Sequence, residues 1–296
     1  MNLNKMFVLY ISKMSEYEKF MKSIEAKSDA TKKQYRIQYN KLFKLLEKPI
    51  GESSEKKVIG MLDEITNKNN SQALLNIALL VRRLHGLSTT QLEKKREIDK
   101  KKIFTAIKEK NVELKQNLPD YKELVEYMNF LFDNNEWTDY IINYLLINFQ
   151  VRNQDLDFDI VTRKKDANNE NKNYMWLQPK KITYIRNVYK TAKINTPNGN
   201  TGYGKKTNVI TNPKMILALK RVLGCQKSNL ECGTFIPNKS SIAYHLQKAT
   251  YKQLGETLYF KIIVNHFRND LDKIKEISEN RGSDIKTILS FYDIEK

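Results

Sequence analysis

Apolar residues recur at intervals of three and four through the first part of the chain, a pattern that predicts amphipathic helices. The clearest stretch is 15–48, in which basic residues separate Tyr35, Tyr39, Leu42, Leu45 and Leu46. Pro49 and Gly51 end this helix. Shorter or more charged helices are predicted over 56–66, 71–84 and 91–117. Residues 1–116 are therefore predicted to form a basic, all-helical domain.

The pattern changes after the sequence Asn117-Leu-Pro-Asp120, which we interpret as a domain boundary. Asp120 is placed to cap a helix over 121–132, and the next helix, 136–150, is apolar on most sides. Alternating segments then predict strands near 156–160, 175–177, 181–191 and 207–211. Helices are predicted again over 213–223, 269–277 and 284–291.

These patterns predict a fold that is mostly α with a small antiparallel β-sheet. The helical domain, residues 1–116, is followed by an α+β domain, residues 117–296. The 40% hydrophobic content is sufficient for two buried cores, which excludes a wholly disordered chain.

The formal net charge is +18, from 52 Lys and Arg against 34 Asp and Glu. This excess favours a polyanionic partner, and nucleic acid first. The alternative is a Lys- and Asn-rich coding bias, which raises the charge without implying a ligand.

The sequence predicts no metal site and no cofactor. Cys225, Cys232 and the three histidines match no zinc-binding spacing, and free thiols in a reducing compartment are expected. The longest apolar stretch, Tyr140–Phe149, is about half the length that crosses a bilayer. The first residues lack a clear cleavage site. We expect a soluble, intracellular protein with no membrane partner and no small-molecule substrate.

Arg152 and Lys190 are candidates for contact with a phosphate. Arg152 follows the apolar helix and precedes a strand, where its guanidinium can bind two phosphate oxygens. The alternative is a structural pair with Asp155. Lys190 stands near the tip of a predicted hairpin, from which an ammonium can reach DNA and donate a proton. Lysine is abundant in this chain, and three others compete for that role: Lys193, Lys205 and Lys206.

Arg268 and Tyr292 complete the set of candidates. Arg268 precedes the predicted helix 269–277, whose first N–H groups favour a bound phosphate. The alternative is a surface arginine on an amphipathic helix. The chain has 16 tyrosines, so Tyr292 is notable only in combination with the arginines.

In order, the stretches FQVRNQDL, VYKTAK, NHFRNDL and RGSDIKTILSFY resemble the active-site motifs of the tyrosine recombinase, or phage integrase, family. The motif VRNxDL is most similar to the corresponding motif in integrases of large DNA viruses and mobile elements. The resemblance covers about residues 16–296 and rests on motif order more than on identity. It implies an N-terminal core-binding domain that clamps DNA, followed by a catalytic domain.

The resemblance implies a role for each matched residue. Tyr292 attacks a DNA phosphate and forms a 3′-phosphotyrosyl bond. Arg152 and Arg268 stabilise the charge that develops on the phosphorus, and Lys190 protonates the 5′ leaving oxygen. No metal or nucleotide takes part.

The chain departs from the family pattern at two positions. Asn265 stands where the family has a histidine, with His266 one position later. Ser283, or Gly282 or Arg281 in a slipped register, stands at the later His or Trp position. Each lost donor lowers the rate by roughly 10²-fold.

The resemblance implies double-stranded DNA as the partner and a homotetramer on that DNA. For a viral source, it implies a location in the host cytoplasm or nucleus, or in the virion. One alternative is a type IB topoisomerase-like enzyme. A second is a non-catalytic DNA-binding protein that keeps the fold, which the residues at 265 and 283 favour. A third is a basic RNA-binding protein, for which no recognition motif is evident.

Overall fold

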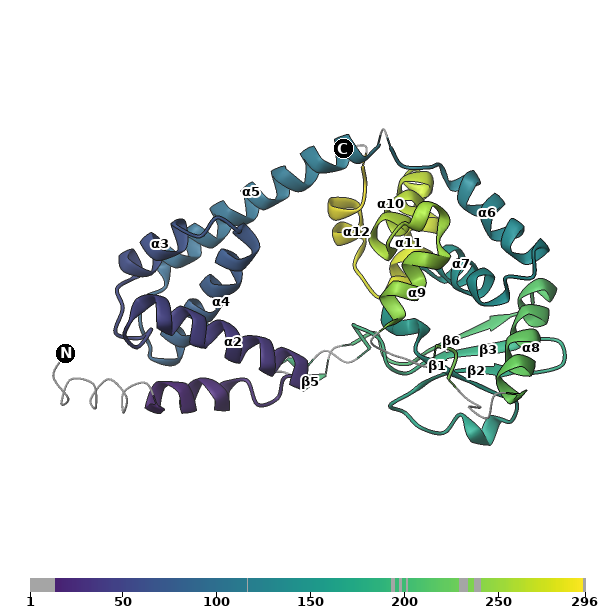
Figure 1. The fold of residues 1–296 in the computed structure, drawn as a ribbon. Helices are drawn as coiled ribbons and strands as arrows, with labels where there is room; N and C mark the ends of the chain where they lie inside the picture. Colours follow the sequence, from purple (N-terminus) through teal and green to yellow (C-terminus); the bar gives the residue numbers. More distant parts are fainter. Residues whose placement is uncertain are drawn as a thin grey trace. The chain divides into compact units, whose positions relative to one another are not determined.

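The computed structural model describes residues 14–115, 117–192, 195–196, 199–200, 202–228, 234–236 and 241–294. These residues are mostly helical and include one four-stranded sheet (Figure 1), so the predicted fold class is confirmed. The chain divides into two compact units between Ile107 and Lys108. This division falls inside a helix, nine residues before the boundary predicted from the sequence. Lys193 and Cys232 lie outside the described residues.

The first unit is helical, as its apolar spacing predicts. After helical residues 14–23 come α2 (Asp29–Leu46), α3 (Glu55–Asp63), α4 (Lys68–Leu84) and the start of α5 (Thr90–Lys115). The predicted continuous helix 15–48 is interrupted at residues 24–28. The reason is local, because the Ser28 side chain accepts a hydrogen bond from the Thr31 N–H and begins a new helix.

The second unit begins with the end of α5 and continues with α6 (Tyr121–Asp133) and α7 (Trp137–Phe149). Asp120 caps α6 as predicted, and Glu123 completes a reciprocal capping box. Residues 140–147 of α7 are all buried, which makes this helix the centre of the core. After α7 the chain turns at Gln150 and forms the short 3₁₀ helix η1 (Asn153–Leu156).

The sheet has the order β1 (Phe158–Val161), β2 (Asn173–Leu177), β3 (Ile182–Arg186) and β6 (Lys206–Ile210). It is mixed rather than purely antiparallel. The segment between β1 and β2, which contains η2 (Lys164–Asp166), returns the chain so that Phe158 pairs with Asn173 in a parallel register. The other two pairings are antiparallel, and β4 (Asn195–Thr196) with β5 (Gly199–Asn200) forms a separate small ladder.

The predicted strand 181–191 ends at Arg186, and residues 187–192 form bends and turns. The chain then continues through α8 (Pro213–Ser228), α9 (Ile242–Ala249), η4 (Tyr251–Gln253), α10 (Glu256–Phe267), α11 (Leu271–Arg281) and α12 (Ile285–Phe291). None of the helices within the described ranges is both long enough and apolar enough to cross a membrane.

Candidate functional site

Cationic side chains gather at the last turn of α11. The final carbonyl groups of a helix lack partners within the helix and carry partial negative charge, so they attract cations. Arg152 Nη1 donates to the Arg281 carbonyl at 2.6 Å, and Arg186 Nη1 donates to the Asn280 carbonyl at 3.0 Å. Lys206 Nζ donates to the Asn280 carbonyl at 3.2 Å and also to that of Glu279. We call Arg152, Arg186, Lys206 and Arg281 the basic cluster.

Arg152 is held in place by its main chain and by residue 283. Its N–H donates to Asp155 Oδ2 at 3.0 Å, and its Nη2 donates to the Ser283 hydroxyl at 3.0 Å. Asp155 lies 3.7 Å from Arg186, so it forms its ion pair there. The pKa of Arg152 is lowered by burial first and then by the positive charge of Arg281. Its two side-chain bonds use two of the five N–H groups of a guanidinium, which leaves capacity to bind an oxyanion.

Lys206, rather than Lys190, is the lysine that reaches this site. Lys190 is exposed in the turn after β3, whereas Lys206 starts β6 and pairs in register with Arg186. The Lys206 ammonium lies 4.6 Å from the centre of the Tyr189 ring. Burial, followed by repulsion from Arg186, lowers its pKa to about 8. An ammonium with such a pKa is charged at neutral pH and gives up its proton readily, as a general acid must.

A turn at Gly282 connects the end of α11 with the segment that follows β3. Gly282 has a φ of 60°, in the left-handed region that glycine adopts without strain. Its carbonyl accepts a hydrogen bond from Thr191 Oγ1 at 2.8 Å. The turn therefore fixes Ser283, the partner of Arg152, close to the residues that follow β3.

Replacing Gly282 with alanine should destabilise the protein by about 1–3 kcal/mol. The added Cβ would clash with Thr191 Oγ1, and the backbone would remain at an unfavourable φ. Urea denaturation measures the change. Gly60→Ala is the matched control, since Gly60 lies inside α3 with nothing within 4 Å of an added Cβ. Equal stability of the Gly282→Ala variant and the wild-type protein would contradict the expected clash.

Arg281 is buried, and both of its terminal guanidinium nitrogens donate to protein groups, while its Nε has no hydrogen-bond partner among the described residues. Nη1 donates to the carbonyls of Gln150 and Val151 at 3.0 Å each, and Nη2 pairs with Glu256. The guanidinium also lies 4.3 Å from the centre of the Phe260 ring. Arg281 therefore joins the end of α11 to the turn that carries Arg152. Its contacts position that turn.

Tyr292 lies near the basic cluster. It ends α12, and its ring meets Phe260 edge-on at a centroid distance of 4.7 Å. Phe260 is the same ring that contacts Arg281. After its burial and Arg281, the groups that act on the pKa of Arg152 include the Tyr292 phenol. Arg152, Ser283 and Lys206 therefore meet at the end of α11, and Tyr292 contacts the same Phe260 ring as Arg281.

Arg268 and Asn265 lie at the C-terminal end of α10. The prediction that Arg268 begins a helix is wrong, because this residue ends α10 and Asp270 caps α11. Glu256, at the start of α10, pairs with Arg281. A helix of this length spans roughly 18 Å, so Arg268 is separated from the basic cluster along the helix axis. Its guanidinium instead lies 3.7 Å from Asp293 Oδ2.

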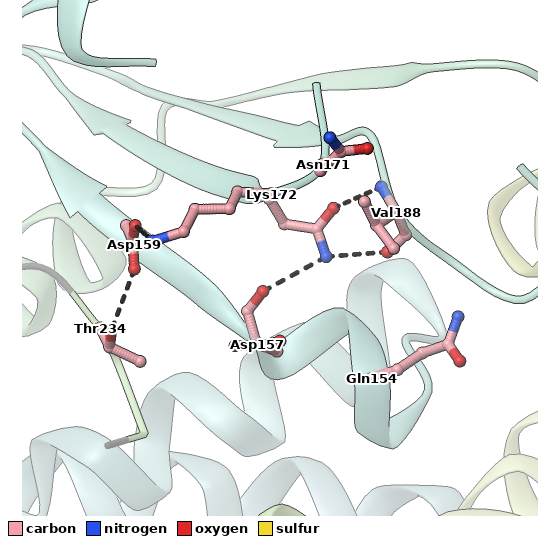
Figure 2. Close-up of a pocket in the computed structure, with 8 residues that line it drawn as sticks. Gln154, Asp157, Asp159, Asn171, Lys172, Val188 and Thr234 are labelled. Carbon is pink, nitrogen blue, oxygen red and sulfur yellow. Dashed lines mark hydrogen bonds and ion pairs between the residues drawn. The ribbon is translucent and has the colours of Figure 1, made fainter. Parts of the chain in front are cut away.

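A small polar cavity of about 170 Å³ lies beside η1 and the β1–β2 pair (Figure 2). Lys172 reaches Asp159 at 2.7 Å, and the Thr234 hydroxyl donates to the same carboxylate at 3.0 Å. The Asn173 amide donates to the carbonyls of Asp157 and Val188. Since these lining groups bind one another, we assign no ligand to the cavity. Within the described part of the chain, no cluster of three metal-ligating side chains occurs.

The crystal structure of XerA recombinase is similar to this chain, with 13% sequence identity and a TM-score of 0.37. The match covers 94% of this chain and 93% of the other. A likeness at this level carries no argument about function. No protein-family model and no curated protein sequence matches the chain. The function is therefore inferred from the geometry of the site.

Proposed function

We propose that this protein binds double-stranded DNA and cuts and rejoins one strand through a covalent bond to Tyr292, as a tyrosine recombinase does. The observation that carries this proposal is the convergence of Arg152, Lys206 and Ser283 on the end of α11, where Arg281 contacts the same Phe260 ring as Tyr292. The net charge of +18 supports a polyanionic substrate.

Each side chain of the site suits one part of a phosphodiester exchange. The Tyr292 hydroxyl releases its proton to solvent as its oxygen attacks phosphorus, and the bond from phosphorus to the 5′ oxygen breaks. Arg152 binds the phosphate oxygens and stabilises the charge of the transition state, with Ser283 holding the guanidinium. Lys206 gives its proton to the departing 5′ oxygen. A 5′-hydroxyl from another strand then reverses these steps.

Strand exchange requires two duplexes in one assembly. The homotetramer implied by the sequence resemblance would hold them, and it forms part of this proposal. We also propose an origin in a virus or mobile element, on the basis of the VRNxDL motif alone.

A trapping experiment tests the covalent step. The wild-type protein is incubated with a pool of nicked duplexes of randomised sequence, in which cleavage releases a short 5′-hydroxyl fragment that diffuses away. We expect a protein–DNA adduct that survives denaturing electrophoresis and disappears on protease treatment. Tight DNA binding without any adduct would contradict the covalent step.

The affinity for DNA should fall steeply with salt concentration, because each phosphate contact releases counterions. For about six contacts, the loss between 50 and 200 mM salt is roughly 10³-fold. Fluorescence anisotropy of a labelled duplex at several salt concentrations measures it. An affinity that is constant over this range would argue against a basic DNA-binding surface.

A non-catalytic DNA-binding protein is the second candidate, favoured by two observations. The Arg281 guanidinium is occupied by Glu256 and main-chain carbonyls, and Arg268 lies at the far end of α10. Arg152 would then be the predicted arginine that is bonded to the end of α11, while Arg268 pairs with Asp293. For a non-catalytic protein we expect the same salt dependence of DNA affinity and no covalent adduct.

A further inference from the structure

Side chains from α5 and α10 contact the segment that carries Tyr292. This C-terminal segment, residues 292–294, follows α12, and both Asp293 and Ile294 are buried. The Phe260 ring contacts Tyr292, and the Arg268 guanidinium lies 3.7 Å from the Asp293 carboxylate. The third contact comes from α5, where Asn111 Nδ2 donates to the Asp293 carbonyl at 3.5 Å.

A buried lysine sets the orientation of Asn111. Asn111 is 2% exposed, and its Oδ1 accepts a hydrogen bond from the ammonium of Lys261 on α10. Because an ammonium can only donate, Oδ1 must face Lys261 and Nδ2 must face the Asp293 carbonyl. Burial lowers the pKa of Lys261, and the charge of Lys110 lowers it further. Burial of a polar pair costs free energy. Its hydrogen bonds fix the orientation of both side chains, which an apolar pair would not do.

We propose that Asn111 and Lys261 are positioning residues that fix the main chain of the C-terminal segment and so set the position of the Tyr292 phenol. Asp293 is directly bonded to Tyr292, so a shift of its carbonyl moves the phenol as well. The catalytic consequence rests on the proposed function, whereas the anchoring of the segment does not.

Asn111→Asp isolates the contact to Asp293. The substitution is isosteric and keeps an acceptor for Lys261, but it removes the donor to the Asp293 carbonyl. Asn129→Asp is a matched control on α6. Asn129 also donates to a main-chain carbonyl, that of Val125, and also accepts from a lysine, Lys214.

Hydrogen exchange followed by mass spectrometry measures the anchoring without requiring activity. We expect Asn111→Asp to speed exchange in the peptide that contains residues 288–294 by roughly tenfold, the change that an easier local opening produces. The Asn129→Asp variant should leave this peptide unchanged. Wild-type exchange in the Asn111→Asp variant would overturn the proposal.

The trapping experiment measures the catalytic consequence. We expect Asn111→Asp to slow adduct formation by roughly 10- to 100-fold, as a small misplacement of a reacting group does, with DNA affinity unchanged. If exchange rises but the adduct rate stays at the wild-type value, the positioning role is overturned. If the wild-type protein forms no adduct, the proposed function fails, and the exchange measurement still decides the anchoring.

A double variant separates positioning from stability. Asn111→Leu with Lys261→Met replaces the polar pair by an apolar pair, which retains the fold at little cost. The Asp293 carbonyl nevertheless loses its donor. We expect a thermal midpoint close to that of the wild-type protein together with the faster exchange of Asn111→Asp. Wild-type exchange in this folded double variant would also overturn the proposal.

Discussion

Replacing Tyr292 with phenylalanine should abolish covalent attachment to nicked DNA while leaving DNA binding intact. The phenylalanine ring keeps the edge-on contact with Phe260, so the site retains its shape. It lacks the oxygen that we propose as the nucleophile, and water or another side chain does not replace a positioned nucleophile. Denaturing electrophoresis of the trapped complex, with anisotropy for binding, measures both quantities.

The matched control is Tyr244→Phe. Tyr244 lies on α9 and is 65% exposed, so loss of its hydroxyl removes a phenol without disturbing the core. This variant should form the adduct at the wild-type rate. An undiminished adduct in the Tyr292→Phe variant would exclude Tyr292 as the nucleophile.

Replacing Lys206 with methionine should lower the rate of adduct formation by roughly 10²- to 10⁴-fold, the usual effect of losing a general acid. The same substitution at Lys190 should have little effect, because that side chain is exposed and Lys206 is the lysine bonded to the end of α11. Single-turnover rates on the nicked duplex compare the two variants. A large loss with Lys190→Met and none with Lys206→Met would reverse the assignment.

The pH dependence of this step follows from the pKa of Lys206, which burial lowers to about 8. Below that pH the ammonium carries the proton that the 5′ oxygen needs. Above it the fraction of protonated lysine falls about tenfold per pH unit, so the rate should decline. A substrate with sulfur at the 5′ leaving position needs no such proton, and it should restore the rate of the Lys206→Met variant.

Much of the fold could be predicted from local signals. Asp120 predicts the start of α6, and the apolar character of 136–150 predicts that α7 is central. The strand 181–191 was predicted too long, because its aromatic and β-branched residues continue into turns beyond Arg186. The parallel pairing of β1 with β2 depends on the path of a loop, which the period of a strand does not reveal.

The site was less predictable because it depends on contacts between distant segments. The sequence does not decide whether Lys190 or Lys206 acts at the site, because both belong to the same lysine-rich hairpin. Only the position of α11 distinguishes them. Arg268 was placed at a helix start, but the buried run 259–264 belongs to a helix that continues to Phe267. Asp270 could have shown where the next helix begins, because aspartate is a favoured N-cap residue and Asp270 lies two positions after Arg268.

We propose above all that Tyr292 becomes bonded to DNA at a site formed by Arg152 and Lys206. The most direct measurement is peptide mapping of the trapped wild-type adduct by mass spectrometry, after digestion of the protein and of the attached DNA. We predict a nucleotide remnant on the phenol of Tyr292. A remnant on any other residue, or a protein that binds the nicked duplexes and never becomes linked to them, would contradict the account.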